Sequence, residues 1–262
     1  GDCVMQCPMC PHPDINLPND WEQAPRWKRF IYRLIMAINA NFRMKNCLRS
    51  SELWDPSFNL GASYMVKEDK YQDHLKTSKH MTNCSKFATL AQANAKSNKG
   101  LRVTGAVGVM CMRHKLWLKL ANLQKGKRYC NIDYVVSAAM EHVQNTLVLL
   151  SYDVACAWSK NMRCHLVGFH TSVACGVSVL CNTVLTFCIP KMHIKGHQKK
   201  CEEPFGFNYQ EGTGSTDGKG IERGWSFVNG AAASTKEMGP GARHDTVDDR
   251  IGHANWKKVI GL

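Results

Sequence analysis

Residues 146–152 (TLVLLSY) constrain the fold more than any other part of this sequence. They form an uninterrupted apolar run of strand length, which is typical of a strand buried within a sheet. Asp153 follows the run directly, and residues 154–161 are predicted to form a helix. A carboxylate at the end of a buried strand is a common metal ligand in α/β folds, because the sheet edge is rigid and open there. The simpler interpretation is that Asp153 caps the following helix.

The rest of the chain alternates between strand-like and helix-like segments. Residues 29–40 are apolar and compatible with a strand, although a helix is not excluded, and residues 105–111 indicate a short strand. Residues 1–25 are rich in Cys and Pro and are expected to be irregular. Helices are predicted over residues 82–97, 134–144 and 191–201.

Composition bounds the class of protein. The chain has 262 residues, and a hydrophobic content of 44% supports a sizeable core. The formal net charge of +13 favours phosphate-rich partners, although a generic basic surface gives the same balance. The 13 cysteines are odd in number and lie in a chain too long for a small disulfide scaffold. They indicate a reducing compartment, with some thiols as metal ligands.

Residues 171–189 carry no charged side chain and are long enough to span a bilayer. The run is rich in Ser, Thr, Gly and Asn, and Pro190 follows it. A buried helix or strand is therefore the favoured interpretation, because such elements are also apolar and uncharged.

Two groups of Cys and His have the spacing of metal ligands. Cys7 and Cys10 form a CxxC, and Cys111 and His114 form a CxxH at the end of a predicted strand. Together they offer a Cys₃His set suited to zinc. The second group lies four residues apart, on one face of the predicted 191–201 helix, where it would bind zinc, lie near a phosphate or simply pack. It consists of His193, His197 and Cys201.

The terminal run 212–249 is dense in Gly and charge, contains Trp225 and lacks the alternation of a core element. With SYDVACAW and NANFRM, its segment STKEMGPGAR closely resembles the KDZ (Kyakuja-Dileera-Zisupton) transposases of fungal type. The resemblance extends from about Cys7 to Lys258. Because the family continues past Leu262 and the chain begins at Gly1, we expect a truncated transposase.

The resemblance implies an α/β, RNase H-like core with a mixed sheet flanked by helices, as in other DDE transposases. It would occupy residues 26–262, with insertions at about 50–105 and 160–212, after a cysteine-containing lead-in at 1–25. Asp153 matches the family's second acid, and Glu222 in IERGW matches its Glu, although a surface carboxylate on a helix looks the same. These acids imply two Mg²⁺ or Mn²⁺ ions and DNA strand cleavage and transfer.

The first acid of the family is replaced here by Asn39. An amide oxygen is neutral and does not bridge two cations as a carboxylate does, so we expect impaired cleavage. Asn122 also replaces an Asp, and Lys127 and Lys219 replace Glu. All four differences correspond to G-to-A changes at the first codon base. They suggest a decayed copy and account for part of the positive charge, unless these positions simply vary within the family.

The resemblance implies DNA as the partner, a nuclear location and no membrane, and leaves a homo-oligomer open. Besides the transposase, we consider an inactive, transposase-derived DNA-binding protein and an unproductive gene. The glycines around Pro240 allow close backbone approach, including to DNA. Basic residues that would hold DNA phosphates, or simply form a solvated surface, are Arg43, Lys45, Arg49, Lys125, Lys127, Arg128, Arg223, Lys236 and Arg243.

Overall fold

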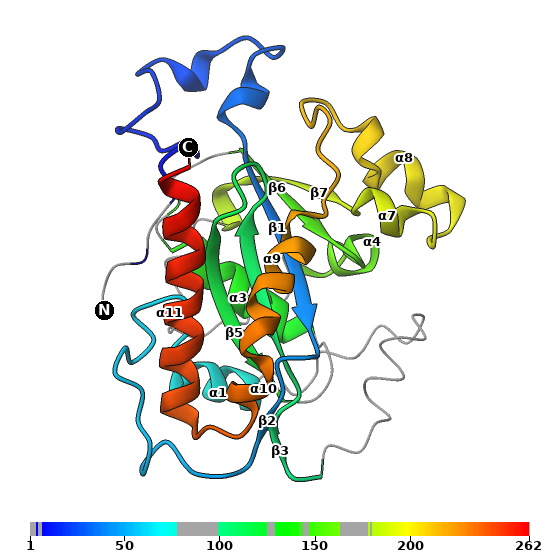
Figure 1. Cartoon of the computed structure of the whole chain (residues 1–262). Helices are drawn as coiled ribbons and strands as arrows, with labels where there is room; N and C mark the ends of the chain where they lie inside the picture. The colour runs from blue at the N-terminus through cyan, green and yellow to red at the C-terminus, as the bar shows by residue number, and fades with distance from the viewer. Residues whose placement is uncertain are drawn as a thin grey trace.

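A computed structural model describes residues 4, 7–77, 99–124, 129–141, 143, 147–162, 178 and 180–261. At its centre lies a five-stranded sheet with the strand order β5-β4-β1-β6-β7 (Figure 1). The sheet is mixed, because β1 is antiparallel to β4 and parallel to β6. Its strands are β1 (Leu34–Asn41), β4 (Gly105–Cys111), β5 (Trp117–Leu123), β6 (Leu147–Tyr152) and β7 (Val184–Cys188).

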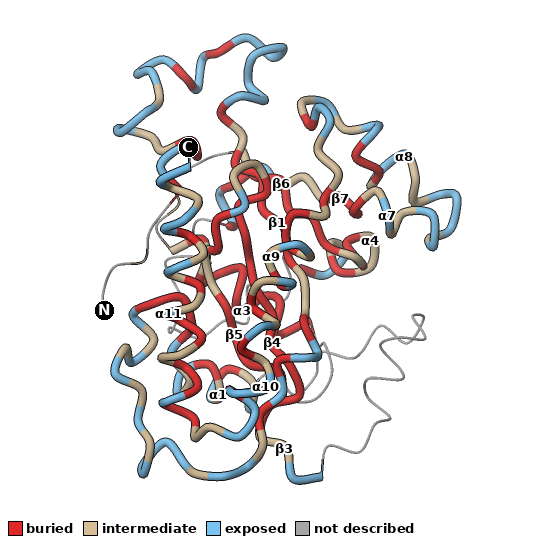
Figure 2. The backbone as a smooth tube through the Cα atoms, in the orientation of Figure 1, coloured by how far each residue is buried: buried red, intermediate tan, exposed pale blue. Residues whose placement is uncertain are grey.

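Both faces of the sheet are covered, which explains why β1 and β6 are apolar over most of their length. Side chains alternate between faces along a strand. Met36 and Ile38 pack with α3 (Tyr129–Ala139) on one face, while Ile35 and Ala37 pack on the other with α9 (Gly220–Val228) and α11 (Pro240–Val259). Figure 2 shows this buried centre, with the exposed backbone gathered in the outlying segments.

The remaining elements are short and lie around this core. The helix α1 (Glu68–Thr77) packs beside α3, where the rings of Tyr71 and Tyr134 are 5.0 Å apart. The other elements are η1 (Trp21–Gln23), η2 (Arg29–Tyr32), β2 (Asn46–Cys47), β3 (Leu101–Val103), α4 (Ala155–Trp158), α7 (Lys191–Ile194), η3 (Lys199–Cys201), α8 (Glu202–Phe205), η4 (Phe207–Tyr209), η5 (Asn229–Ala231) and α10 (Ala232–Lys236).

The strands were predicted better than the helices. The expected strands at 105–111 and 146–152 are present as β4 and β6, and the described residues of 1–25 are irregular apart from η1. The helix expected at 134–144 begins earlier, at Tyr129, and ends at Ala139. The helix expected at 154–161 is only the single turn α4. The helix expected at 82–97 lies outside the described residues.

The prediction of one continuous helix over residues 191–201 was wrong. The segment instead contains α7, a turn that includes Gly196, and η3. Glycine costs about 1 kcal/mol in a helix interior relative to alanine, and this segment buries no residue that would offset the cost. The three ligand candidates on it therefore do not share one helix face.

The uncharged run 171–189 ends as β7, an edge strand of the sheet. Val184 at its start is 61% exposed, so this end of the run is not the fully buried element that was expected, whereas Cys188 at its end is buried. Among the described residues, no helix is long and apolar enough to cross a membrane.

Candidate active site and metal centres

Asn39 and Asp153 occupy neighbouring positions near the carboxyl ends of two parallel strands, β1 and β6. Ile38 in β1 is in register with Tyr152 in β6. Asn39 follows Ile38 in the chain, and Asp153 follows Tyr152. By strand alternation, Asn39 lies on the same side of the sheet as Ala37, which packs toward α9. The carboxyl end of parallel strands is where open α/β sheets bind their ligands.

The helix α9 crosses this face at close range and carries Glu222. Trp225, one turn after Glu222, packs against Trp117 with ring centroids 4.6 Å apart. A Cβ at Gly108, the strand partner of Asn39, would lie 2.7 Å from Trp117 and 3.2 Å from Trp225. Because only glycine leaves room for the two indoles, Gly108 sets how closely α9 approaches β1 and β4.

His193 joins the two acidic residues. Its Nε2 atom lies 2.9 Å from Oε1 of Glu222 and 3.7 Å from Oδ1 of Asp153. The three side chains are 36%, 30% and 25% exposed, so the group is open to solvent on one side. The sequence grouped His193 with His197 and Cys201 as a ligand set, whereas the structure places it against the acids.

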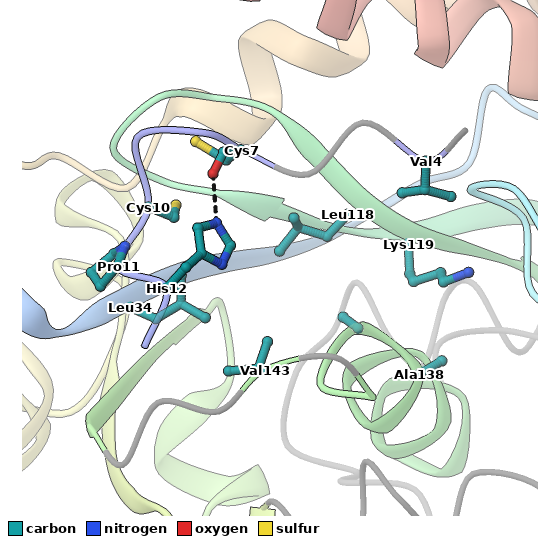
Figure 3. Close-up of a pocket in the computed structure, with 11 residues that line it drawn as sticks. Val4, Cys7, Cys10, Pro11, His12, Leu34, Leu118, Lys119, Ala138 and Val143 are labelled. Atoms are coloured by element: carbon teal, nitrogen blue, oxygen red, sulfur yellow. Dashed lines mark hydrogen bonds between the residues drawn. The ribbon is translucent and has the colours of Figure 1, made fainter. Parts of the chain in front are cut away.

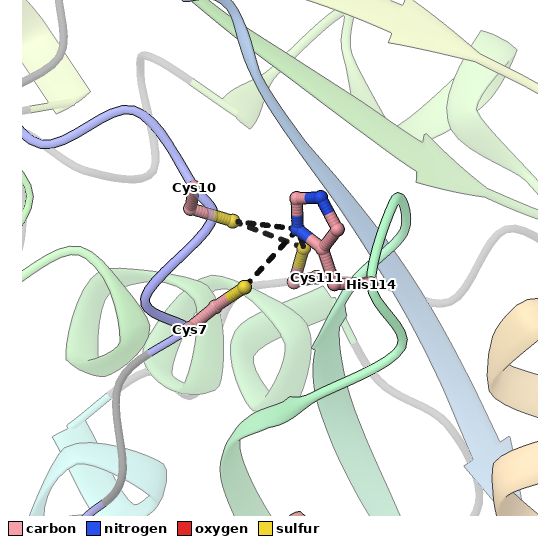
Figure 4. A group of neighbouring side chains, drawn as sticks. All are labelled: Cys7, Cys10, Cys111 and His114. Atoms are coloured by element: carbon pink, nitrogen blue, oxygen red, sulfur yellow. Dashed lines mark hydrogen bonds between the residues drawn. The ribbon is translucent and has the colours of Figure 1, made fainter. Parts of the chain in front are cut away.

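The four residues of the predicted Cys₃His set come together from distant parts of the chain (Figure 4). Nδ1 of His114 lies 3.1 Å from Sγ of Cys7 and 3.6 Å from Sγ of Cys111. Sγ of Cys10 lies 3.0 Å from Sγ of Cys111. All four ligand atoms are within 4.8 Å of one another, and the three cysteines are buried.

The electrostatics of this cluster favour a bound cation. Hydrogen bonds from the Cys10 and Cys111 thiols lower the pKa of Cys7 to about 2. The pKa of Cys10 is raised far above its usual range, mainly by its contact with the Cys111 thiol, then by its contact with Cys7 and by burial. Three buried thiolates in contact repel one another, so all three lose their protons together only when a metal ion balances their charge.

Residues of the same N-terminal segment stabilise the CxxC turn through contacts with its backbone. The Cys10 amide donates to the Cys7 carbonyl at 3.2 Å, and the His12 ring contacts the same carbonyl through Nε2 at 2.8 Å. Next to the turn is a mostly apolar pocket lined by residues that include Leu34, Leu118 and Val143 (Figure 3). The cluster therefore fastens the irregular N-terminal segment to the sheet.

A second group of ligand atoms lies near the acids. Cys156 in α4, His197 in the turn after α7, and Cys201 at the end of η3 place their ligand atoms within 4.8 Å of one another. Sγ of Cys156 is 3.4 Å from Nδ1 of His197. Cys156 takes the place that the sequence gave to His193.

The chain matches the model of a known protein family over most of its length. The model of the Kyakuja-Dileera-Zisupton (KDZ) transposase matches residues 32–255. The chain belongs to the KDZ transposase family. The match includes Asn39, Asp153 and Glu222, while Cys7 and Cys10 precede it. No curated protein and no solved structure matches the chain.

Most of the basic residues proposed to contact DNA lie on the surface, with one clear exception. Arg43 is exposed, Lys236 lies 3.5 Å from Glu237, and Arg223 lies 3.4 Å from Asp217. Arg49 pairs with Glu237 at 2.6 Å. Lys45 is also exposed, and Lys125, Lys127 and Arg128 lie outside the described residues.

Arg243 does not face DNA, and its prediction as a phosphate contact was wrong. Its side chain is fully buried and donates to the Asn122 side-chain oxygen at 2.5 Å and to the Met44 carbonyl at 3.0 Å. Burial lowers the pKa of Arg243 to about 10.

The glycines around Pro240 approach the protein's own chain. A Cβ at Gly241 would lie 2.3 Å from backbone atoms of Pro56, and one at Gly239 would lie 2.1 Å from the Asp55 carboxylate. The Gly241 amide donates to the Asp55 carbonyl at 2.9 Å. The expected close approach is therefore real, but the loop at Asp55 occupies the space that the sequence offered to DNA.

Proposed function

We propose that this chain is a DDE-type KDZ transposase domain with an RNase H-like core, whose DNA cleavage and strand transfer are impaired by Asn39. The observation that supports it best is the meeting of Asp153 and Glu222 at His193, over the strand ends where Asn39 lies. The mixed sheet, with β1 between an antiparallel and a parallel neighbour, supports the RNase H-like assignment.

The carboxylates of Asp153 and Glu222 fit a hard divalent cation such as Mg²⁺ or Mn²⁺, because such ions prefer oxygen ligands. When bound, a pair of such ions would activate a water or 3′-hydroxyl nucleophile and stabilise the leaving oxygen of a phosphodiester. Asn39 presents a neutral amide at the third position, so the site has one negative charge fewer than the family's set of three acids. This missing charge is the proposed cause of impairment.

DNA binding follows from the same family assignment and from the charge. The formal net charge is +13, and Arg43, Lys45 and Lys236 are exposed. Such side chains bind phosphates with little sequence readout, so the affinity should fall steeply with salt concentration. The Cys7, Cys10, Cys111 and His114 cluster would hold a structural zinc, because its four protein ligands complete a tetrahedral shell.

Nicking of supercoiled DNA in Mg²⁺ or Mn²⁺ tests the activity, using this chain, Asn39→Asp and Asn39→Asp combined with Asp153→Ala. We expect little or no nicking by this chain, clear nicking by Asn39→Asp, and loss of that gain when Asp153 is replaced. Nicking by the unmodified chain that Asp153→Ala abolishes would show that Asn39 is tolerated. Equal inactivity of the first two proteins would contradict the proposed disarmed enzyme.

A second candidate is a catalytically inactive DNA-binding protein derived from the transposase. The replacement of the first acid by Asn39 favours it, because loss of cleavage leaves the basic surface unchanged. Salt-dependent DNA binding by a chain that stays inactive as Asn39→Asp would support this alternative. If the chain neither cleaves nor binds DNA, the remaining explanation is an unproductive gene.

A further inference from the structure

The segment from Lys191 to Phe205 contains no fully buried residue, and only Ile194 and Phe205 pack against the core as partly buried side chains. It contains three short helical pieces, α7, η3 and α8, and none of them has a buried residue. Its ends are tied by backbone hydrogen bonds, from Lys191 to the Asp217 carbonyl and from Ile189 to the Phe205 carbonyl. Segments that cannot bury a core are commonly stabilised by disulfides or metal ions.

Within this segment, the ligand atoms of His197 and Cys201 lie close to that of Cys156, which belongs to α4 outside the segment. The three ligand atoms lie within 4.8 Å of one another, and all three residues are half-buried. Two thiols and one imidazole form a donor set that suits zinc and does not suit Mg²⁺. Zinc would displace the protons of the two thiols and bring its ligands to bond distance.

We propose that Cys156, His197 and Cys201 bind a second zinc ion, which fastens residues 191–201 to α4. Three protein ligands leave the fourth tetrahedral position to a water molecule. Among the residues that the structure describes, no fourth Cys, His, Asp or Glu joins the group. The site is distinct from the Cys₃His cluster and shares no ligand with it.

The position of this site gives it a consequence for the acids. Cys156 is three residues after Asp153, and His197 is four residues after His193. A metal ion that joins Cys156 to His197 therefore fixes the two backbone segments that bring His193 against Asp153 and Glu222. His193 is then a residue positioned by the zinc, and not one of its ligands.

The metal content of the purified full chain, measured by mass spectrometry after dialysis against zinc-free buffer, tests the proposal without any assay of catalysis. We expect two zinc ions per chain for the unmodified protein. The Cys201→Ser variant and the Cys10→Ser variant should each retain one zinc ion, because each replacement removes a ligand of a different site. His193→Gln is the matched control, because it changes a neighbouring histidine that the proposal excludes from the ligands, and it should keep two. Two ions in Cys201→Ser, or one in His193→Gln, would overturn the ligand set.

Cobalt spectra and limited proteolysis keep the test decisive if a variant folds poorly. Co²⁺ titrated into Cys10→Ser should give thiolate-to-cobalt absorption from a site with two thiolates, and adding Cys156→Ser to that variant should weaken the absorption. Trypsin should cut faster after the exposed Lys195, Lys199 and Lys200 when zinc is chelated or Cys201 is replaced. Unchanged cleavage at these lysines, with the same cobalt absorption in Cys10→Ser and in Cys10→Ser combined with Cys156→Ser, would refute the site.

Discussion

His193 Nε2 lies 2.9 Å from Oε1 of Glu222, although the two residues come from separate helices, α7 and α9. The same nitrogen is 3.7 Å from Oδ1 of Asp153. One imidazole thus contacts both carboxylates of the proposed active site. We propose that His193 is a positioning residue, which holds the two acidic side chains near each other.

Replacing His193 with Gln in the active Asn39→Asp background should lower the rate of nicking by about 10- to 100-fold, the range observed for residues that orient metal ligands. The cause would be poorer placement of Glu222, so the concentration of Mn²⁺ needed for half-maximal nicking should rise as well. A lower rate with an unchanged Mn²⁺ dependence would contradict the positioning role. Circular dichroism of both proteins controls for misfolding.

Asn122→Asp combined with Glu68→Gln should stabilise the protein, because it gives the buried guanidinium of Arg243 a charged acceptor at the position where Asn122 accepts at 2.5 Å. The second change is needed because the Asn122 amide nitrogen donates to Oε2 of Glu68 at 3.0 Å, where two carboxylates would otherwise repel each other. A hydrogen bond between charged groups is roughly twice as strong as one with a neutral partner, so the free energy of unfolding should rise by about 1 kcal/mol. Urea denaturation at neutral pH measures it. Asn131→Asp is the matched control, since that buried amide contacts the Tyr71 hydroxyl, and it should destabilise. A loss of stability in both variants would disprove the ion-pair argument.

Gly241→Ala should lower the free energy of unfolding by about 1–3 kcal/mol or more, the usual cost of overpacking. The added methyl would lie 2.3 Å from backbone atoms of Pro56, which cannot rotate away. Gly252→Ala, in the same helix α11, provides the control, because its methyl meets only Tyr64 at 3.7 Å. There the helix propensity of alanine should add up to about 1 kcal/mol. Thermal melts of the two variants should shift in opposite directions.

The sequence predicted those parts of the site that rest on local pattern. Residues 146–152 indicate a buried strand, so the sequence alone predicts Asp153 at its end, and β6 confirms the strand. The two short motifs of the Cys₃His cluster were paired because their spacing suits zinc, and the structure brings them together. Glu222 was found through the family motif, since a carboxylate at the start of a helix carries no signal of its own.

What the sequence missed depends on contacts between distant residues. Arg243 and the surface arginines look alike in the sequence, and only the fold buries Arg243 beside Asn122. His193 and His197 have helical spacing, but the turn containing Gly196 separates them and lets Cys156 take the place of His193. No periodicity reveals such a contact, because it is fixed by where β6, α4 and α7 lie in space.

The stability of the fold should also depend on the protonation of His74 in α1. His74 is 8% exposed and packs against the Tyr134 ring at 5.2 Å, and burial lowers its pKa to about 4. In the unfolded chain a histidine titrates near 6.5. Between these two values the unfolded state binds more protons, so the contribution of His74 is complete above pH 6.5 and is lost as the pH falls toward 4.

His74→Phe removes this titration while keeping an aromatic ring beside Tyr134. The difference in unfolding free energy between the variant and the unmodified chain should therefore grow in favour of the variant by up to about 3 kcal/mol between pH 6.5 and 4. Comparing the two proteins cancels the other groups that titrate in this range, including His244, whose pKa burial also lowers to about 4, and Asp248, whose pKa burial raises to about 6. Urea denaturation at several pH values measures the difference, and a difference that stays constant with pH would show that His74 is not held neutral by burial.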